Sequence, residues 1–228
     1  MLDTVLVPIH RAGWPFIAIF FAVAVVLGFL WAPLFWLGLI LTLWCAYFFR
    51  DPPRTTPTDP RLVSSPADGV VCAVGPRVPP PELALGDQPL PCIGIFMNVF
   101  DVHVNRTPVP GRIEASEYHK GQFLNASLDK ASELNERRSW RIRTSRGDAV
   151  GLVQIAGLVA RRIVALAEPG DEVLPGERIG LIRFGSRCDV YLPAGTIPLA
   201  ITGQRAVAGE TVLADLDNRS PAREGRTA

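Results

Sequence analysis

Residues 14–31 (WPFIAIFFAVAVVLGFLW) and residues 34–49 (LFWLGLILTLWCAYFF) form two apolar runs joined by Ala32-Pro33, and neither run contains a charged residue. An α-helix rises about 1.5 Å per residue, so the first run would span roughly 27 Å, close to the hydrocarbon thickness of a bilayer. A proline at the junction favours two helices over one continuous helix. The sequence therefore predicts a membrane-associated helical hairpin within residues 1–50.

A secretory signal peptide is the alternative interpretation of these runs. The apolar stretch is too long for one, and no small-residue cleavage site precedes Arg50. Basic residues flank the hairpin on both sides, with Arg11 before it and Arg50, Arg54 and Arg61 after it. By the positive-inside rule, we expect both ends of the hairpin, and the domain that follows it, on the cytoplasmic side of the cytoplasmic membrane. The second run is short, so a hairpin in one leaflet stays an alternative to a spanning one.

The composition excludes several classes of function. The 228 residues carry a net charge of +1, so no global basic field indicates a nucleic-acid partner. The four cysteines are scattered, without a CxxC pair or a histidine at zinc spacing, so we expect no structural metal and a reducing compartment. These cysteines are Cys45, Cys72, Cys92 and Cys188.

The remainder of the chain is predicted to be mostly strands. A proline- and threonine-rich linker covers residues 51–63, and residues 64–228 form the following domain. Strand patterns and glycine turns predict strands in residues 63–75, 92–100, 137–157 and 170–193, the third of these a hairpin turning at Arg146-Gly147-Asp148. Residues 76–91 are expected to form a proline-rich surface loop, and residues 121–136 a weak helix. The predicted class is α+β, a mainly-β soluble domain behind an N-terminal hydrophobic helical hairpin.

The pair Gly185-Ser186 lies between apolar residues 179–184 and a strand expected at residues 188–192. A Gly-Ser pair alone usually indicates an ordinary turn. A tight bend in a rigid domain also suits backbone self-cleavage, in which the Ser186 hydroxyl attacks the Gly185 carbonyl to give an ester. Elimination and hydrolysis would then leave a pyruvoyl group at residue 186. The products would be residues 1–185 and residues 186–228.

Six segments in the same order closely resemble the phosphatidylserine decarboxylase family, in its short single-domain, archaeal-type form. The segments are FFRDPPR (48–54), FMNVFDVHVNRTPVPG (96–111), EYHKGQFLNA (117–126), LNERRS (134–139), QIAGLVARRI (154–163) and RFGSRCDVYLP (183–193). The resemblance implies a proenzyme whose Ser186 becomes a covalent pyruvoyl cofactor after cleavage between Gly185 and Ser186. It also implies the substrate, phosphatidylserine in the membrane, whose amine forms a Schiff base with the pyruvoyl group. CO2 loss then yields phosphatidylethanolamine, a step of phospholipid biosynthesis.

The resemblance assigns roles to two further residues and leaves one role open. It implies that His103 acts in decarboxylation, as a general acid, and that Asp68 supports activation of the serine. The long form of the family has a second histidine where this chain has Arg106, and a guanidinium cannot serve as a base. The base that activates Ser186 is therefore left open between His119, Asp68 and His103. Arg106 is an alternative ligand for the lipid phosphate or the serine carboxylate.

Other interpretations remain to be weighed. A biotinyl or lipoyl carrier would need a lysine at an exposed hairpin, and no lysine lies beyond Lys130. A pyruvoyl decarboxylase acting on a soluble amino acid would leave the hairpin without a purpose. Arg161 and Arg162 form either a solvated patch or a surface for anionic headgroups. Cys188 is expected to be a buried small hydrophobe, and the two fragments are expected to stay together as a heterodimer.

Overall fold

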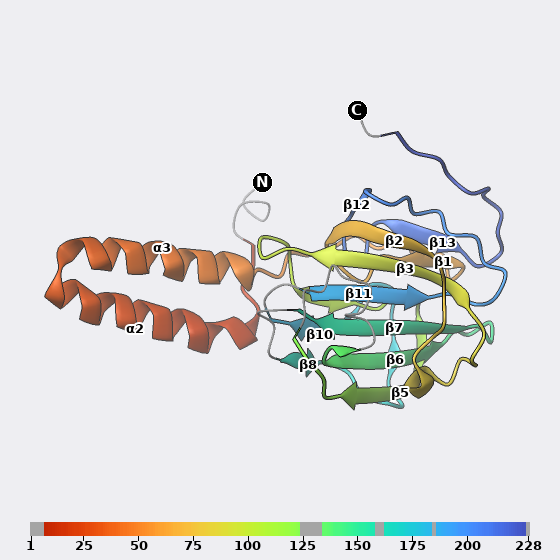
Figure 1. Cartoon of the computed structure of the whole chain (residues 1–228), viewed down its shortest axis with the longest axis horizontal. Coiled ribbons are helices and arrows are strands. Elements are labelled where there is room, and N and C mark those ends of the chain that lie inside the picture. The colour runs from red at the N-terminus through yellow and green to blue at the C-terminus, as the bar shows by residue number, and fades with distance from the viewer. Residues whose placement is uncertain (1–6, 124–133, 158–161, 184–185, 227–228) are drawn as a thin grey trace. The chain divides into compact units, whose positions relative to one another are not determined.

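The structure is a computed structural model that describes residues 7–123, 134–157, 162–183 and 186–226 (Figure 1). The chain divides into two compact units. The first comprises Met1–Pro53 with Phe100–Val102, and the second comprises Arg54–Val99 with His103–Ala228. The division after Pro53 falls inside the linker expected at residues 51–63.

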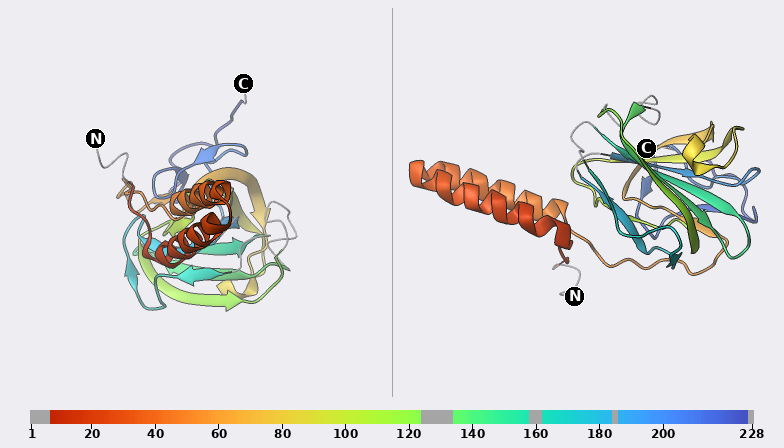
Figure 2. Two further views of the ribbon diagram at one scale, coloured as in Figure 1. Left: turned by 90° about the vertical axis from the view of Figure 1, so that its left-hand side faces the viewer. Right: turned by 90° about the horizontal axis from the view of Figure 1, so that it is seen from below.

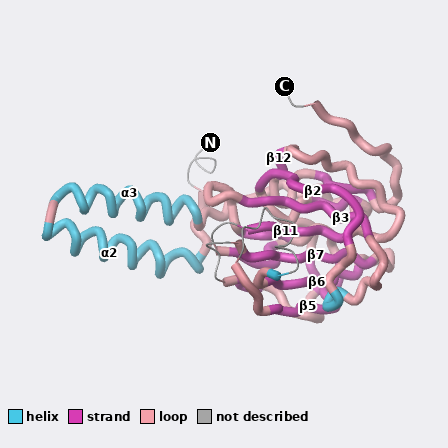
Figure 3. Tube along the Cα trace, viewed as in Figure 1, coloured by secondary structure: helices cyan, strands magenta, loops and turns pink. Residues whose placement is uncertain are grey.

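Helix is concentrated in the first unit and strand in the second (Figure 3). The helical elements are η1 (Arg11–Gly13), α2 (Trp14–Leu30), α3 (Ala32–Phe48) and η2 (Pro81–Leu83). The first strands are β1 (Leu62–Ser64), β2 (Gly69–Arg77), β3 (Leu90–Met97), β4 (Val104–Arg106), β5 (Gly111–His119), β6 (Arg137–Arg143) and β7 (Ala149–Ala156). The later strands are β8 (Ile163–Ala165), β9 (Glu172–Val173), β10 (Arg178–Ile182), β11 (Ser186–Tyr191), β12 (Arg205–Ala206) and β13 (Val212–Asp215).

The two apolar runs form the predicted hairpin, α2 and α3. The break falls at Trp31, whose backbone is extended, and each helix carries a proline in its first turn. Close packing depends on small residues, because a Cβ at Gly38 would lie 2.5 Å from the Cβ of Ala24. Such contacts between small residues are typical of helices that associate within a membrane.

Most of the hairpin's apolar side chains are exposed. Phe29 is 86% exposed and Leu30 is 77% exposed, which no core helix of a water-soluble domain would show. The segment Arg11–Leu30 has 20 residues and a mean hydropathy of 2.4, enough by length and composition to cross a membrane. The N-terminal helix therefore suggests membrane association.

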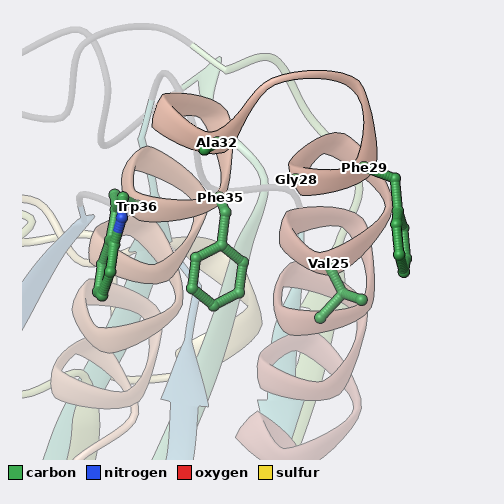
Figure 4. Close-up of a pocket in the computed structure, with 6 residues that line it drawn as sticks. All are labelled: Val25, Gly28, Phe29, Ala32, Phe35 and Trp36. Atoms are coloured by element: carbon green, nitrogen blue, oxygen red, sulfur yellow. The ribbon is translucent and has the colours of Figure 1, made fainter.

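A shallow apolar groove lies at the turn end of the hairpin (Figure 4). Its lining consists of Val25, Gly28, Phe29, Ala32, Phe35 and Trp36. In Figure 4, Phe35 lies between the two helices. The only polar side-chain atom in this lining is the indole nitrogen of Trp36, so the groove offers no chemistry and suits contact with acyl chains.

The strands of the second unit form three antiparallel sheets. Eight strands pair in the order β12-β2-β3-β11-β7-β6-β5-β9, three in the order β4-β10-β8, and two as β1-β13. Figure 2 shows the second unit from two further sides, with its long sheet curved. The mainly antiparallel β architecture behind an apolar helical hairpin confirms the predicted fold class.

Both faces of the long sheet are covered. One face carries the main core, which includes Trp140, Leu152 and Val190. The other carries a smaller cluster in which Leu83 packs with Cys92, Val153, Ile155 and Tyr191. Burial on both faces explains why the central strands read as continuous apolar runs in place of an alternating pattern.

Two local expectations meet different outcomes. The hairpin at Arg146-Gly147-Asp148 is confirmed, since β6 and β7 flank it and Gly147 has a φ of 90°. The expectation of a surface loop at residues 76–91 is wrong in part, because η2 places Leu83 in the second core cluster, where it is 1% exposed. Most of the helix predicted for residues 121–136 lies outside the described residues.

A buried ion pair on β11 gives a test of this packing. Arg187 Nε lies 2.6 Å from Asp189 Oδ1, with side chains 1% and 0% exposed. Replacing Asp189 by Asn leaves the guanidinium buried without its counter-charge, which should lower the free energy of unfolding by about 3–5 kcal/mol. Urea denaturation followed by circular dichroism in detergent, with both chains compared in a Ser186→Ala background so that they stay uncut, measures the loss. The control Asp217→Asn, at a partly exposed ion pair, should cost below about 1 kcal/mol, and equal losses would contradict the assignment.

Candidate active site

Ser186 is the first residue of β11 and is fully buried. The backbone ladders pair it with Met97 of β3 on one side and Ala156 of β7 on the other. Its Oγ lies 3.8 Å from the Met97 Sδ, a weak acceptor. The sequence placed Ser186 in a bend, whereas the structure places it in a strand. Phe184 and Gly185, the acyl side of the expected cleavage site, lie outside the described residues.

The chain changes sheets immediately before Ser186. Strand β10, which ends at Ile182, belongs to the three-stranded sheet, and β11 belongs to the eight-stranded sheet. Only residues 183–185 connect the two strands. Ser186 is therefore held by a short crossing between two sheets that are each fixed by their own hydrogen bonds.

His103 is also fully buried and directly precedes β4. Its backbone oxygen accepts a hydrogen bond of 3.2 Å from the Ile182 nitrogen, which extends the pairing of β4 with β10 by one residue. Side chains two residues apart in an extended chain share a face, so His103 lies on the same face of this segment as Asn105.

A chain of buried amide hydrogen bonds reaches the neighbourhood of Ser186. Trp140 Nε1 donates to Gln154 Oε1 at 2.8 Å, and Gln154 Nε2 donates to Asn105 Oδ1 at 2.8 Å. Asn105 Nδ2 then lies 3.5 Å from the sulfur of Met97, the same atom that Ser186 Oγ contacts. Met97, Asn105, Trp140 and Gln154 are all fully buried. The structure thus brings three strands of the long sheet and β4 together around Ser186.

Asp68 lies in a different set of contacts. Its Oδ2 accepts a hydrogen bond of 2.6 Å from Arg54 Nη2, and its Oδ1 accepts one of 2.8 Å from the Ala208 backbone nitrogen. Both side chains are largely buried, at 15% exposed for Arg54 and 11% for Asp68. Each oxygen of this carboxylate thus has a structural partner. No hydrogen bond between described residues joins Asp68 to Ser186.

The other residues expected near the site lie in different surroundings. His119 is exposed at the end of β5, and β6 and β7 separate β5 from β11. Three strand spacings amount to roughly 14 Å, beyond the reach of a base for Ser186. Arg106 is buried, and its Nη1 donates to the Gly176 oxygen at 2.8 Å. The guanidinium thus has an internal partner in the strand-rich unit.

The cysteine beside the site behaves as the sequence predicted. Cys188 lies in the main core, and burial raises the pKa of its thiol well above the usual value, so it stays protonated and inert. Among the described residues, no group of three or more His, Cys, Asp or Glu side chains could hold a metal ion.

Sequence reasoning missed Asn105 and Gln154. Gln154 carried a signal, because it is the single polar side chain in the apolar run of β7. Asn105 follows His103 by two residues, which is the spacing of one strand face. Their meeting depends on two different sheets facing each other, and no local pattern reports that.

The contacts of Asp68 generate a stability prediction. Removing the carboxylate in Asp68→Ala deletes two charge-assisted hydrogen bonds and leaves Arg54 without its counter-ion. The free energy of unfolding should fall by about 2–4 kcal/mol. Urea denaturation in a Ser186→Ala background keeps the chain uncut during the measurement. The exposed Asp87→Ala should change stability by less than about 0.5 kcal/mol, and a similarly small effect at Asp68 would contradict the structural role.

Comparisons with known proteins agree with this geometry. The family model described as "Phosphatidylserine decarboxylase" matches residues 41–214. A protein of Beijerinckia indica subsp. indica, described as "Phosphatidylserine decarboxylase proenzyme", is 59% identical over 214 residues, which cover 94% of this chain and 92% of that protein. The match includes β3, β4, β7 and β11, the strands that surround Ser186. The chain belongs to the phosphatidylserine decarboxylase family.

Proposed function

We propose that this chain is a membrane-anchored proenzyme that cuts itself between Gly185 and Ser186 and then decarboxylates phosphatidylserine to phosphatidylethanolamine. The observation that carries the proposal is the position of Ser186, buried at the start of β11 in a chain of this family. The family uses a pyruvoyl group made from a serine, and Ser186 is the residue proposed to supply it.

The surroundings of Ser186 suit attack by its hydroxyl. Between described residues, its Oγ contacts only the Met97 sulfur, so no strong acceptor holds the hydroxyl proton. In the proposed reaction, the oxygen loses its proton and adds to the Gly185 carbonyl carbon. The bond from that carbon to the Ser186 nitrogen then breaks, and the nitrogen gains a proton. Loss of the Ser186 α-proton and cleavage of its Cβ–O bond then release the Gly185 carboxylate and leave dehydroalanine at residue 186. Water hydrolyses the dehydroalanine, which releases its nitrogen as ammonia and leaves a ketone.

The residues around position 186 fit a pyruvoyl group, because the buried NH2 group of Asn105, whose present partner is the Met97 sulfur, would be available to hold it by a hydrogen bond. Such a group supplies an electrophilic ketone that withdraws electrons from the carbon that loses CO2. We assign His103 as the general acid that returns a proton to that carbon. Its burial, and its place on the same strand face as Asn105, support this role. Asp68 stays a prediction for the activation of Ser186.

Two arginines beside the site support an anionic headgroup as substrate. Arg183 donates its backbone nitrogen to the Arg162 oxygen at 3.3 Å, three residues before Ser186 in the chain. Burial, and then the charge of Arg162, lower the pKa of Arg183. Two guanidinium groups of like charge favour a bound phosphate or carboxylate. Arg161, the other member of the expected patch, lies outside the described residues.

Strand pairing supports a stable heterodimer of the two products. Residues 186–228 contribute β11, β12 and β13, whose partners β3, β7, β2 and β1 all belong to residues 1–185. Because β11 is hydrogen-bonded on both sides, the smaller product cannot leave without breaking two ladders. The larger product carries the hairpin, so both would stay at the membrane.

Variants of two buried residues separate processing from turnover. Ser186→Ala should abolish both cleavage and CO2 release from labelled phosphatidylserine, because no nucleophile and no cofactor precursor remain. His103→Ala should still be cut but should lose about 10²- to 10⁴-fold in kcat. Mass spectrometry of the purified chains identifies the fragment that begins at the modified residue 186. An intact wild-type chain that turns over phosphatidylserine would refute the proposal.

The proposed cytoplasmic side is tested with trypsin on membrane vesicles. Arg223 is exposed in the C-terminal residues of the second unit. Trypsin should shorten the 186–228 fragment in inside-out vesicles and leave it whole in right-side-out vesicles, because the flanking arginines favour a cytoplasmic domain. Detergent added to the right-side-out vesicles is the control for access. If trypsin cut the fragment only in right-side-out vesicles, the proposed cytoplasmic orientation would be wrong.

A further inference from the structure

The orientation of the Asn105 amide is determined by its neighbours. An indole N–H only donates, so the Gln154 atom beside Trp140 Nε1 must be the oxygen. Gln154 therefore presents its NH2 group to Asn105, and the Asn105 atom that receives it must be the oxygen. The NH2 group of Asn105 then faces away from Gln154, toward the Met97 sulfur.

Gln154 has little freedom to reverse this arrangement. A Cβ at Gly180 would lie 2.8 Å from Gln154 Nε2 and 3.0 Å from Gln154 Oε1, so the side chain packs directly against the backbone of β10. Both of its hydrogen bonds are short and fully buried. The orientation of the NH2 group of Asn105 is thus set before any reaction begins.

The NH2 group of Asn105 has only weak partners in the uncut chain. Its contact with the Pro66 oxygen is 3.5 Å, which is long for an N–H···O bond, and its other contact, also 3.5 Å, is with the Met97 sulfur, a weak acceptor. Ser186 Oγ contacts the same sulfur. A buried donor with weak partners, which shares the Met97 sulfur with a nucleophilic oxygen, is suited to turn to that oxygen as negative charge develops on it.

We propose that Asn105 is a positioning residue for self-cleavage, and that the chain Trp140–Gln154–Asn105 presents its NH2 group to the Ser186 oxygen. This inference rests on the proposed function, since it assigns a role in that same cleavage. The NH2 group holds Ser186 Oγ and stabilises the charge on it while its proton leaves. Asn105 accepts no proton and is not the base.

Two substitutions test separately whether the Asn105 amide is needed and whether its orientation is needed. Asn105→Leu keeps the approximate volume and removes the donor. In Gln154→Glu, an ionised carboxylate is an acceptor on both oxygens, so Asn105 would turn its NH2 group toward residue 154 and its oxygen toward Ser186. Arg138, the cross-strand neighbour of Gln154, supplies a nearby positive charge for the new carboxylate. The matched control Thr107→Val deletes another buried hydrogen bond just after β4, to the Leu174 oxygen at 2.8 Å.

Each full-length chain is made by cell-free translation with phospholipid vesicles, and the uncut chain is followed over time after translation stops. We expect Asn105→Leu and Gln154→Glu to slow cleavage by about 100-fold, while Thr107→Val stays near the wild-type rate. Thermal unfolding checks that each variant is folded. If Gln154→Glu does not fold, Gln154→Met takes its place. Cleavage of Asn105→Leu at the wild-type rate, or of the folded Gln154 variant at that rate, overturns the inference.

Hydroxylamine distinguishes the first chemical step from the second. It cuts the ester formed when Ser186 Oγ has captured the Gly185 acyl group, and it leaves the peptide bond intact. If Asn105 acts before the ester forms, hydroxylamine should release no rapid burst of fragment from Asn105→Leu. A burst would show that the ester forms without Asn105 and would overturn the inference. A wild-type chain that is never cut at residue 186 would instead refute the proposed function.

Discussion

The central constraint on this fold is the double pairing of β11. Each of its six residues, from Ser186 to Tyr191, is paired with β3 on one side and with β7 on the other, and all six are buried. Because the side chains of a strand alternate, this register alone sends Ser186 into the main core and Arg187 to the opposite face. A slip of one residue would exchange the two. The position of the proposed nucleophile therefore depends on the pairing of the whole sheet.

The opposite face of β11 carries a buried ion pair that depends on a glycine in the neighbouring strand. The Arg187–Asp189 pair lies across from Gly94, where a Cβ would come within 2.7 Å of Arg187 Nη2 and 2.9 Å of Asp189 Oδ1. Glycine at this position leaves room for the two side chains against the backbone of β3. Burial alone would lower the pKa of Arg187, and the Asp189 carboxylate more than offsets that effect.

The sequence was sufficient for the hairpin and for the class of the domain, because long apolar runs and glycine turns are local signals. It did not predict which strands pair, since β3 and β11 are about ninety residues apart and meet only in the folded sheet. Ser186 and His103 were identified through the family's motifs, and the structure adds that both are buried. The sequence left His119 as a candidate base for Ser186, but the strand order places it far from β11. Asn105 and Gln154 come from different sheets, and this explains why neither was singled out.

If the chain is cut at the proposed site, the segment that carries β11 through β13 becomes a separate chain, and this determines the order of folding and cleavage. The sheet must form while the chain is still one molecule, when closing the loop costs only its internal entropy. After the cut, unfolding would release two polypeptides, and refolding would become a bimolecular, concentration-dependent reaction. Native protein would then be preserved by its rate of unfolding more than by an equilibrium. The proposed cut would thus turn a reversible folding transition into one that proceeds, in practice, in a single direction.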